Sequence, residues 1–262
     1  MRPAWLLLVV ACCAAGCGSS SKQSEPATTA TQGETTATAG TTTIGAITNP
    51  APTPVQVRVY FLRGGKVAPV TRSVAPDRPA TFALNELARG PETGEPGLTN
   101  EYRGGAALKS IDSGTAKIEL VANLSRPALA QVVYTLTQFP TVKRVETTRS
   151  VGKPLTRASF EDETPAILIE SPTPGTNAKS PLRVFGTANT FEATFALDIR
   201  NSSNQTFTHQ IVTATSGSGT RGTFDTTVSF TANGSIWLVA YEPSAENGAP
   251  LHTVRIPLFV GG

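Results

Sequence analysis

The distribution of cysteine constrains this chain more than any other feature of its sequence. The 262 residues include three cysteines, at positions 12, 13 and 17. The chain after Cys17 therefore forms no disulfide, has no zinc site of the cysteine type and offers no thiol nucleophile. Everything beyond that point has to be held together by ordinary hydrophobic cores.

The cysteines end a segment that is typical of an export signal. One basic residue precedes an apolar run at positions 4–15, which is too short to span a bilayer as a stable helix. Cys17 follows a small residue and precedes glycine and serines, a pattern that resembles a bacterial lipobox with Ala14 in the place usual for leucine. We expect residues 1–16 to be a lipoprotein signal peptide and Cys17 to carry the lipid. Two alternatives stay open: a lipobox at Cys12, which leaves a shorter apolar run, and ordinary cleavage that releases a secreted product.

Composition separates residues 17–54 from the rest of the chain. This segment consists mainly of Thr, Ala, Gly, Ser and Pro, and it has almost no large apolar residues. Such a segment cannot bury enough surface to offset the entropy of ordering it. We predict a disordered stalk that lifts a folded module off a membrane, although the same composition also suits a plain spacer.

From Val55 onward the composition is globular and sufficient for two domains. Residues 55–157 alternate between strand and helix patterns. Gly64-Gly65 predicts a tight turn between two strands, and a helix begins at Pro79 and stops before Gly90-Pro91. A hairpin that turns near Ser113-Gly114 follows.

A second helix begins after Ser125, a suitable N-cap, and ends by Pro140. One strand follows it, with a further short strand at 153–155. This order of elements predicts an α+β domain in which one sheet carries both helices on one face.

The second helix has an apolar stripe and a polar side. The apolar stripe consists of Leu129, Val132, Val133 and Leu136. The opposite side carries Gln131, Thr135 and Gln138, with Tyr134 at its border. Aromatic residues on polar faces are enriched at interfaces, so Tyr134 and Gln131 are candidates for contact with another protein. The alternative is that Tyr134 packs against the sheet edge or the second domain.

Residues 158–165 are polar and proline-terminated, which predicts a linker between domains. The acidic run at 161–163 is more typical of solvated carboxylates than of a calcium site. Residues 166–260 contain about seven short strand patterns and predict an all-β immunoglobulin-like sandwich. We expect Trp237 in its core, and Pro257 on a strand at a sheet edge.

The sequence contains no recognisable catalytic, cofactor or metal site. Gly217–Gly222 matches G-x-G-x-x-G but lies between predicted strands, so we expect a hairpin loop there. His209 and His252 lie in strand patterns without partners at a spacing typical of metal or triad sites. The net charge of +3 is spread out, and no basic stripe indicates nucleic-acid binding.

Several motifs resemble a known family. ALNELARGP, GTAKIELV and VYTLTQFP, within Val55–Leu155, resemble the GerM-type sporulation and germination domain, GerMN. ESPTPG, SPLRVFGTANTFEATF, TRGTF and VRIPLFV resemble the immunoglobulin-like domain of bacterial spore germination. The resemblance implies a protein that is not an enzyme, and modules that help to assemble complexes of the cell envelope.

These features predict a lipid-anchored protein on the extracytoplasmic face of the cell membrane. We expect it to be a non-catalytic scaffold or adaptor with an envelope protein as its partner, and with some capacity for self-association. The alternative is a surface module that binds wall glycan or a small ligand through aromatic residues of the sandwich.

Overall fold

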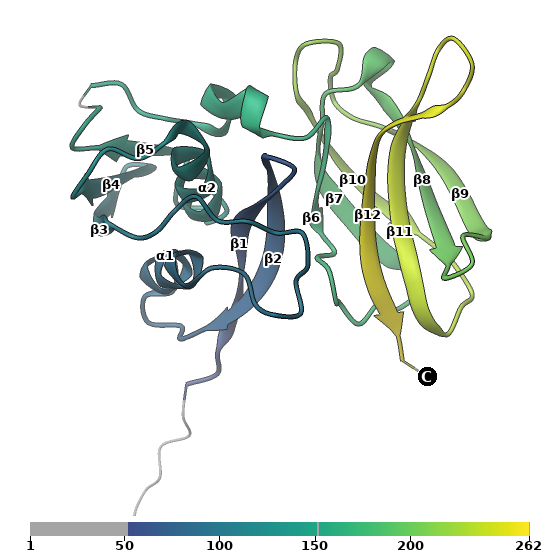
Figure 1. The fold of residues 1–262 in the computed structure, drawn as a ribbon, viewed down its shortest axis with the longest axis horizontal. Helices are drawn as coiled ribbons and strands as arrows, with labels where there is room; N and C mark the ends of the chain where they lie inside the picture. Colours follow the sequence, from purple (N-terminus) through teal and green to yellow (C-terminus); the bar gives the residue numbers. More distant parts are fainter. Residues whose placement is uncertain (1–51, 151, 262) are drawn as a thin grey trace, which may run out of the picture. The chain divides into compact units, whose positions relative to one another are not determined.

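The computed structural model describes residues 52–150 and 152–261, and residues 50–262 form one compact unit (Figure 1). The expected lipidation at Cys17 and residues 17–51 of the expected stalk lie outside the described residues. No helix among the described residues is long and apolar enough to cross a membrane.

Helices and strands mix in the first part of the unit, whereas the second part consists of strands and one short helical turn. The first part comprises β1 (Val55–Arg63), β2 (Lys66–Val74), α1 (Pro79–Arg89), β3 (Ala106–Asp112), β4 (Thr115–Leu120), α2 (Arg126–Leu136), β5 (Arg144–Thr147) and the 3-10 helix η1 (Arg157–Glu163). The second comprises β6 (Ile167–Ser171), β7 (Leu182–Ala188), η2 (Phe191–Ala193), β8 (Thr194–Asn201), β9 (Thr206–Thr213), β10 (Gly222–Val228), β11 (Gly234–Pro243) and β12 (Pro250–Val260).

Local signals set the element boundaries of the first part. Gly64 and Gly65 both have positive φ in the two-residue turn between β1 and β2, a conformation that favours glycine. Helix α1 begins at Pro79 and is followed by Gly90 with φ 90°. The Ser125 side chain caps α2 by accepting a hydrogen bond from the Ala128 amide at 3.3 Å. These predictions are confirmed.

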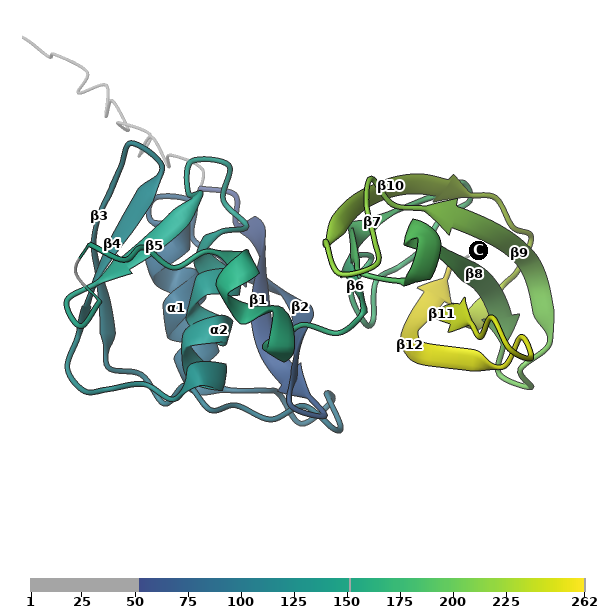
Figure 2. The ribbon, with the colours of Figure 1, turned by 90° about the horizontal axis from the view of Figure 1, so that it is seen from above.

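The prediction of one sheet with both helices on one face is wrong. Strands β1 and β2 form a two-stranded antiparallel sheet, while β3, β4 and β5 form a separate sheet in which β4 and β5 are parallel. Both helices lie between these two sheets and contact each of them (Figure 2). The expected strand at 153–155 is reduced to a single bridge between Val145 and Leu155.

The position of α2 between two sheets explains the error. Its apolar stripe is largely buried as expected, but Gln131 and Thr135 on the opposite side are also fully buried. A helix with one solvated side would expose these residues. Here a second layer covers them, so the polar side is an internal contact.

Residues 158–165 do not form an open linker. Most of this segment belongs to η1, and the Phe160 side chain is 1 % exposed within the core of the first part. The acidic run is paired with arginines: Glu161 contacts Arg221 and Glu163 contacts Arg126, each within 2.9 Å. The ring of Phe160 anchors the chain before it enters β6.

Strands β6–β12 form two antiparallel sheets in the orders β10-β7-β6 and β12-β11-β8-β9. Pro257 lies on β12, the outermost strand of its sheet, as predicted. Trp237 is not a core residue, because the register of β11 directs Ile236, Leu238 and Ala240 into the core and leaves Trp237 half-buried on the other face. The loop at 217–222 joins β9 to β10 in different sheets, so it is not a hairpin.

Candidate functional site

The polar side of α2 hydrogen-bonds to the free edge of β1. Gln138 Oε1 accepts from the Arg58 amide at 2.6 Å, and its Nε2 donates to the Arg58 carbonyl. Thr135 Oγ1 accepts from the Tyr60 amide at 3.2 Å, and Gln131 Nε2 donates to the Tyr60 carbonyl at 3.1 Å. Side chains about one helical turn apart thus meet alternate residues of the strand. Helix α2 takes the place of a third strand beside β1.

Gln131 also binds the loop that precedes β3. Its Oε1 accepts hydrogen bonds from the amides of Glu101 and Tyr102 at 3.0 and 3.1 Å. Its Nε2 additionally donates to Asn100 Oδ1 at 3.0 Å. The side chain is fully buried, so the prediction that Gln131 contacts another protein is wrong. The residue instead satisfies main-chain groups that would otherwise be buried without partners.

Tyr134 is also unavailable to another protein, because its side chain is 1 % exposed. Its hydroxyl lies 2.6 Å from Thr164 Oγ1, and its ring centroid lies 5.3 Å from that of Tyr60. The prediction of a partner contact is wrong here too. The alternative is closer to what is found, since Tyr134 packs against the segment that leads into the second part of the chain.

Arg157 and Glu170 form a partly buried ion pair where η1 is followed by β6. The Arg157 guanidinium lies 4.7 Å from the Tyr134 ring centroid and 5.6 Å from that of Tyr60, and its Nε donates to Thr137 Oγ1 at 2.8 Å. The Glu170 carboxylate also lies 3.6 Å from Arg58. Burial, assisted by the Glu170 charge, raises the pKa of Tyr60 to about 12. The cluster joins β1, α2, η1 and β6.

A second ion pair reinforces this junction. Arg221 donates to both carboxylate oxygens of Glu161 at 2.9 Å and to the Pro165 carbonyl at 2.9 Å. The hydrogen bonds from Arg221 lower the pKa of Glu161 below its ordinary value. Thr71 on β2 and Thr173 after β6 add a hydroxyl contact of 2.6 Å. Polar contacts along η1 and β2 thus connect the α+β part to the sandwich.

The histidines of the sandwich pair with carboxylates. His209 Nδ1 lies 2.7 Å from Asp198 Oδ1, and His252 Nε2 lies 3.7 Å from Glu242. Asp198 is 2 % exposed at its side chain and is also bound by Arg200 at 2.5 Å. Within residues 52–150 and 152–261, no three His, Cys, Asp or Glu side chains are grouped so as to hold a metal ion.

The outer face of the four-stranded sheet is rich in aromatic and cationic side chains. Arg255 lies 5.2 Å from the Trp237 ring centroid, and Arg200 lies 5.7 Å from that of Tyr241. Phe207 on the edge strand β9 is 45 % exposed. Planar rings on a sheet face can stack on flat ligands.

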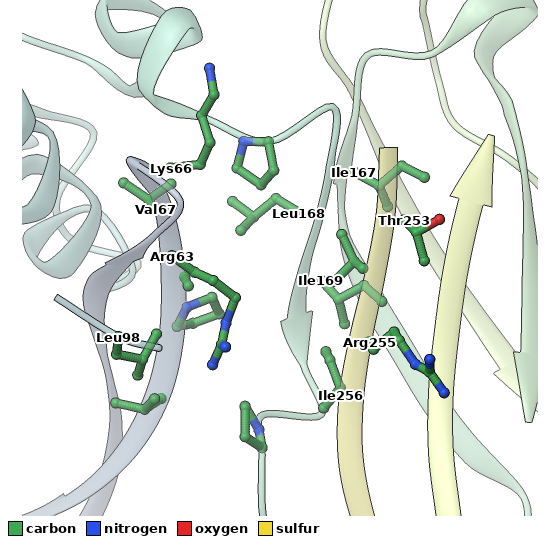
Figure 3. A pocket seen from close by; sticks show the side chains of 16 residues that line it. Arg63, Lys66, Val67, Leu98, Ile167, Leu168, Ile169, Thr253, Arg255 and Ile256 are labelled. Carbon is green, nitrogen blue, oxygen red and sulfur yellow. The ribbon is translucent and has the colours of Figure 1, made fainter. Parts of the chain in front are cut away.

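An apolar pocket of about 230 Å³ lies beside β2, β6 and β12 (Figure 3). Consecutive residues of each strand line it: 66–70 of β2, 167–169 of β6 and 253–256 of β12. Leu168 points toward the β1–β2 hairpin, and Arg63 extends between that hairpin and β6 (Figure 3). None of the lining residues is acidic. Its alignment along strand edges was not visible in the sequence, because strand patterns do not show which edges are covered.

The described chain comprises an α+β part followed by an immunoglobulin-like β-sandwich. The first domain is similar over residues 58–155 to the family described as sporulation and spore germination. The second is similar over residues 166–249 to the immunoglobulin-like domain of bacterial spore germination. The resemblance seen in the sequence is thereby confirmed at the level of sporulation and germination domains.

One solved structure is similar to part of the chain. It is a crystal structure of a Clostridium perfringens protein provisionally assigned as a lipoprotein, with 17 % identity, a TM-score of 0.26, and coverage of 43 % of this chain and 93 % of that one. A TM-score this low carries no argument about the fold. No curated protein matches the chain.

Proposed function

We propose that the protein is a non-catalytic adaptor of the cell envelope, anchored by a lipid at Cys17 on the extracytoplasmic face of the membrane. The observation that carries the proposal is the pairing, on one chain, of two regions similar to sporulation and germination domains. Glu170 of the second region contacts both Arg58 of the first region, at 3.6 Å, and Arg157 of the segment that joins them, which supports their action as a unit. An adaptor with two binding faces needs such contacts to keep the orientation of one face fixed with respect to the other.

The lipobox and the stalk-like composition support the proposed location. A thioether at Cys17 and residues 17–54 would place the folded unit outside the membrane at the end of a tether. Metabolic labelling with an alkyne fatty acid tests this part. Label that depends on Cys17 supports the anchor, whereas equal label on a Cys17→Ser variant contradicts it.

The adaptor itself is tested by chemical crosslinking of the intact protein in its native membrane, followed by mass spectrometry. We expect reproducible capture of a defined envelope protein. Capture of only this protein and wall fragments contradicts the proposal. The partner surface to map must be exposed, so Tyr134 and Gln131 are not suitable positions for crosslinkers.

A second candidate function is binding of wall glycan, and the outer face with Trp237 and Tyr241 favours it. Sugar rings present flat apolar faces that stack on aromatic side chains. Co-sedimentation with purified wall material should fall for a Trp237→Ala variant and stay unchanged for a Phe191→Ala variant, whose side chain is exposed on η2. Equal co-sedimentation of the wild type and the Trp237→Ala variant contradicts glycan binding through this face.

A further inference from the structure

Three strands that each end a sheet meet at the apolar pocket. Strand β2 is one of two in its sheet, β6 is last in the order β10-β7-β6, and β12 is first in the order β12-β11-β8-β9. All three line the same space, and no hydrogen-bonded ladder joins any two of them. A terminal strand presents unpaired main-chain groups along its outer edge.

The register identifies at least one outward-facing residue on each strand that lines the pocket. On β2 this residue is Val67, because its partner Leu62 exchanges hydrogen bonds with Thr99 on the opposite edge of β1. On β6 it is Ile167, because the preceding residue accepts from the Asn189 amide in the ladder with β7.

On β12 the outward-facing residue is Arg255. Pro257 and Phe259 use their outer edge to bind residues 175–178, with the Gly175 amide donating to the Pro257 carbonyl at 2.9 Å. The ladder to β11 is continuous from 255 to 259, so the main chain of Arg255 faces the same way. The segment at 175–178 stops short of it, and the amide and carbonyl of Arg255 have no hydrogen-bond partner among the described residues.

The outer edge of β1 shows how unpaired main-chain groups of a terminal strand are satisfied elsewhere in this protein. On β1, Gln131, Thr135 and Gln138 satisfy the outward amides and carbonyls of Arg58 and Tyr60. No corresponding side chains serve Val67, Ile167 and Arg255 within the described residues. Val67 and Ile167 are 1 % and 0 % exposed, whereas Arg255 lies on an exposed stretch of β12, so the edge of β12 is the template for an added strand.

The charge of the lining indicates the character of the added strand. Arg63 donates to the Pro96 carbonyl at 3.1 Å and Lys66 Nζ to the Asp162 carbonyl, and neither cation has a carboxylate partner among the described residues. The Arg255 guanidinium is engaged with Trp237. Two cations without carboxylate partners beside an apolar pocket favour a segment that has apolar side chains and an acidic residue.

The volume of the pocket favours a peptide over a small-molecule cofactor as its ligand. Its volume of about 230 Å³ is smaller than that of most small-molecule sites, which occupy about 300–1,000 Å³. An extended peptide needs less enclosed space, because main-chain hydrogen bonds supply much of its affinity and only alternate side chains enter pockets.

We propose that the groove between β2, β6 and β12 binds an extended, acidic and apolar peptide segment of a partner protein by strand addition. The inference rests on the proposed adaptor function and names the kind of segment that the adaptor recognises. The peptide pairs with the exposed edge of β12 at Arg255, turns apolar side chains toward the pocket, and places a carboxylate near Arg63 and Lys66.

Selection of a random peptide library displayed on phage, with the full chain as the target, tests this proposal. We expect enriched sequences that alternate apolar residues and include Asp or Glu. The enriched peptide is then titrated calorimetrically against the full chain and its variants. Failure to enrich any such sequence overturns the proposal, even where membrane crosslinking returns a partner and the adaptor function stands.

Two substitutions at one position separate main-chain pairing from charge. Arg255→Pro removes the outward amide without affecting the ladder to β11, as Pro257 already does two residues on, and should weaken binding about tenfold. Arg255→Ala keeps the amide and should change affinity by less than about threefold. Equal binding by wild type and Arg255→Pro, in a variant that melts normally, contradicts pairing at β12. The proposal of strand addition then fails.

Charge reversal supplies a second, independent readout. Lys66→Glu should weaken binding about fivefold, while Lys153→Glu, at an exposed position outside the pocket, should not. Tighter binding after deletion of residues 19–54 would assign the groove to the stalk of the same chain. In a further outcome, decanoate displaces the peptide and binds the wild type and Arg255→Pro with equal affinity. That result would assign the groove to small amphipathic anions. Either result overturns the proposal of a partner peptide.

Discussion

Gln131 on α2 donates a hydrogen bond to the carbonyl of Tyr60 on β1 at 3.1 Å, 71 residues away in the sequence. The same amide group also binds Asn100, and its oxygen binds two amides of the loop before β3. One side chain thus joins a strand edge, a helix and a loop. Its contacts are internal, and they make Gln131 a determinant of folding.

Replacing Gln131 with methionine should destabilise the protein strongly. Methionine has a similar size but removes the partner of the Tyr60 carbonyl and of the Glu101 amide, while the Tyr102 amide keeps Asn100 Oδ1, and each loss at a buried group costs about 1–3 kcal/mol. We expect the free energy of unfolding to fall by about 3 kcal/mol, measured by urea denaturation. The control is Gln56→Met on the exposed start of β1, which should change stability by less than about 0.5 kcal/mol. Equal effects of the two substitutions would contradict the role of the hydrogen bonds.

The Arg157–Glu170 pair should show strong coupling in a double-mutant cycle. Arg157→Met leaves a buried carboxylate with only the more distant Arg58, so we expect a loss of about 3 kcal/mol in stability. Glu170→Gln in the same chain removes the unpaired charge and should restore part of that loss. Thermal or urea unfolding of the four proteins gives the coupling energy. Additive effects would show that the contact does not stabilise the junction.

Alkaline pH should lower the free energy of unfolding, because Tyr60 ionises. Its pKa is raised to about 12 by burial, whereas an unfolded tyrosine titrates near about 10. The folded state disfavours the phenolate, so this contribution is fully present below pH 10 and is lost as the pH rises toward 12. A shift of this size corresponds to about 2–3 kcal/mol.

Unfolding curves recorded between pH 8 and 12 measure this effect. A Tyr60→Phe variant should lose less stability with rising pH than the wild type does. Tyr241→Phe, at a half-buried ring on the outer face of the sandwich, should keep the wild-type slope. An identical dependence of stability on pH for the wild type and Tyr60→Phe would show that ionisation of Tyr60 does not cause the loss.

Acid pH should weaken the second ion pair of the junction. Hydrogen bonds from Arg221 lower the pKa of Glu161, so the stabilisation is present above the ordinary carboxyl pKa and is lost as the pH falls through the lowered value. The Glu161 side chain is 40 % exposed, so solvent screens the pair and its contribution at pH 7 should not exceed about 1 kcal/mol.

Stability measured from pH 7 to 3 tests this pair. The difference between the wild type and Glu161→Gln should shrink as the pH falls, since Glu161 becomes protonated as the pH passes through its lowered pKa. Glu146→Gln, at a carboxylate of β5 outside the junction, is the matched control and should not alter the pH dependence attributed to Glu161. A difference that stays constant with pH would show that the charge of Glu161 is not the stabilising feature.

The elements with local signals could be predicted from the amino-acid sequence. Pro79, Ser125 and the Gly64-Gly65 turn act through the conformation and hydrogen bonding of their immediate neighbours, and the helices and the first hairpin begin and turn at these residues. The seven strands of the sandwich likewise follow from alternation and turn residues.

The role of the polar residues on α2 depends on contacts that no local pattern predicts. A helical pattern shows that Gln131, Thr135 and Gln138 share one side of α2, but it does not show what that side meets. Water, a partner protein and a strand edge all offer hydrogen-bond partners to the same side chains. In this fold the partner is β1, because its outer edge has no neighbouring strand at Arg58 and Tyr60. Buried main-chain groups need hydrogen-bond partners, and the polar side chains of α2 supply them.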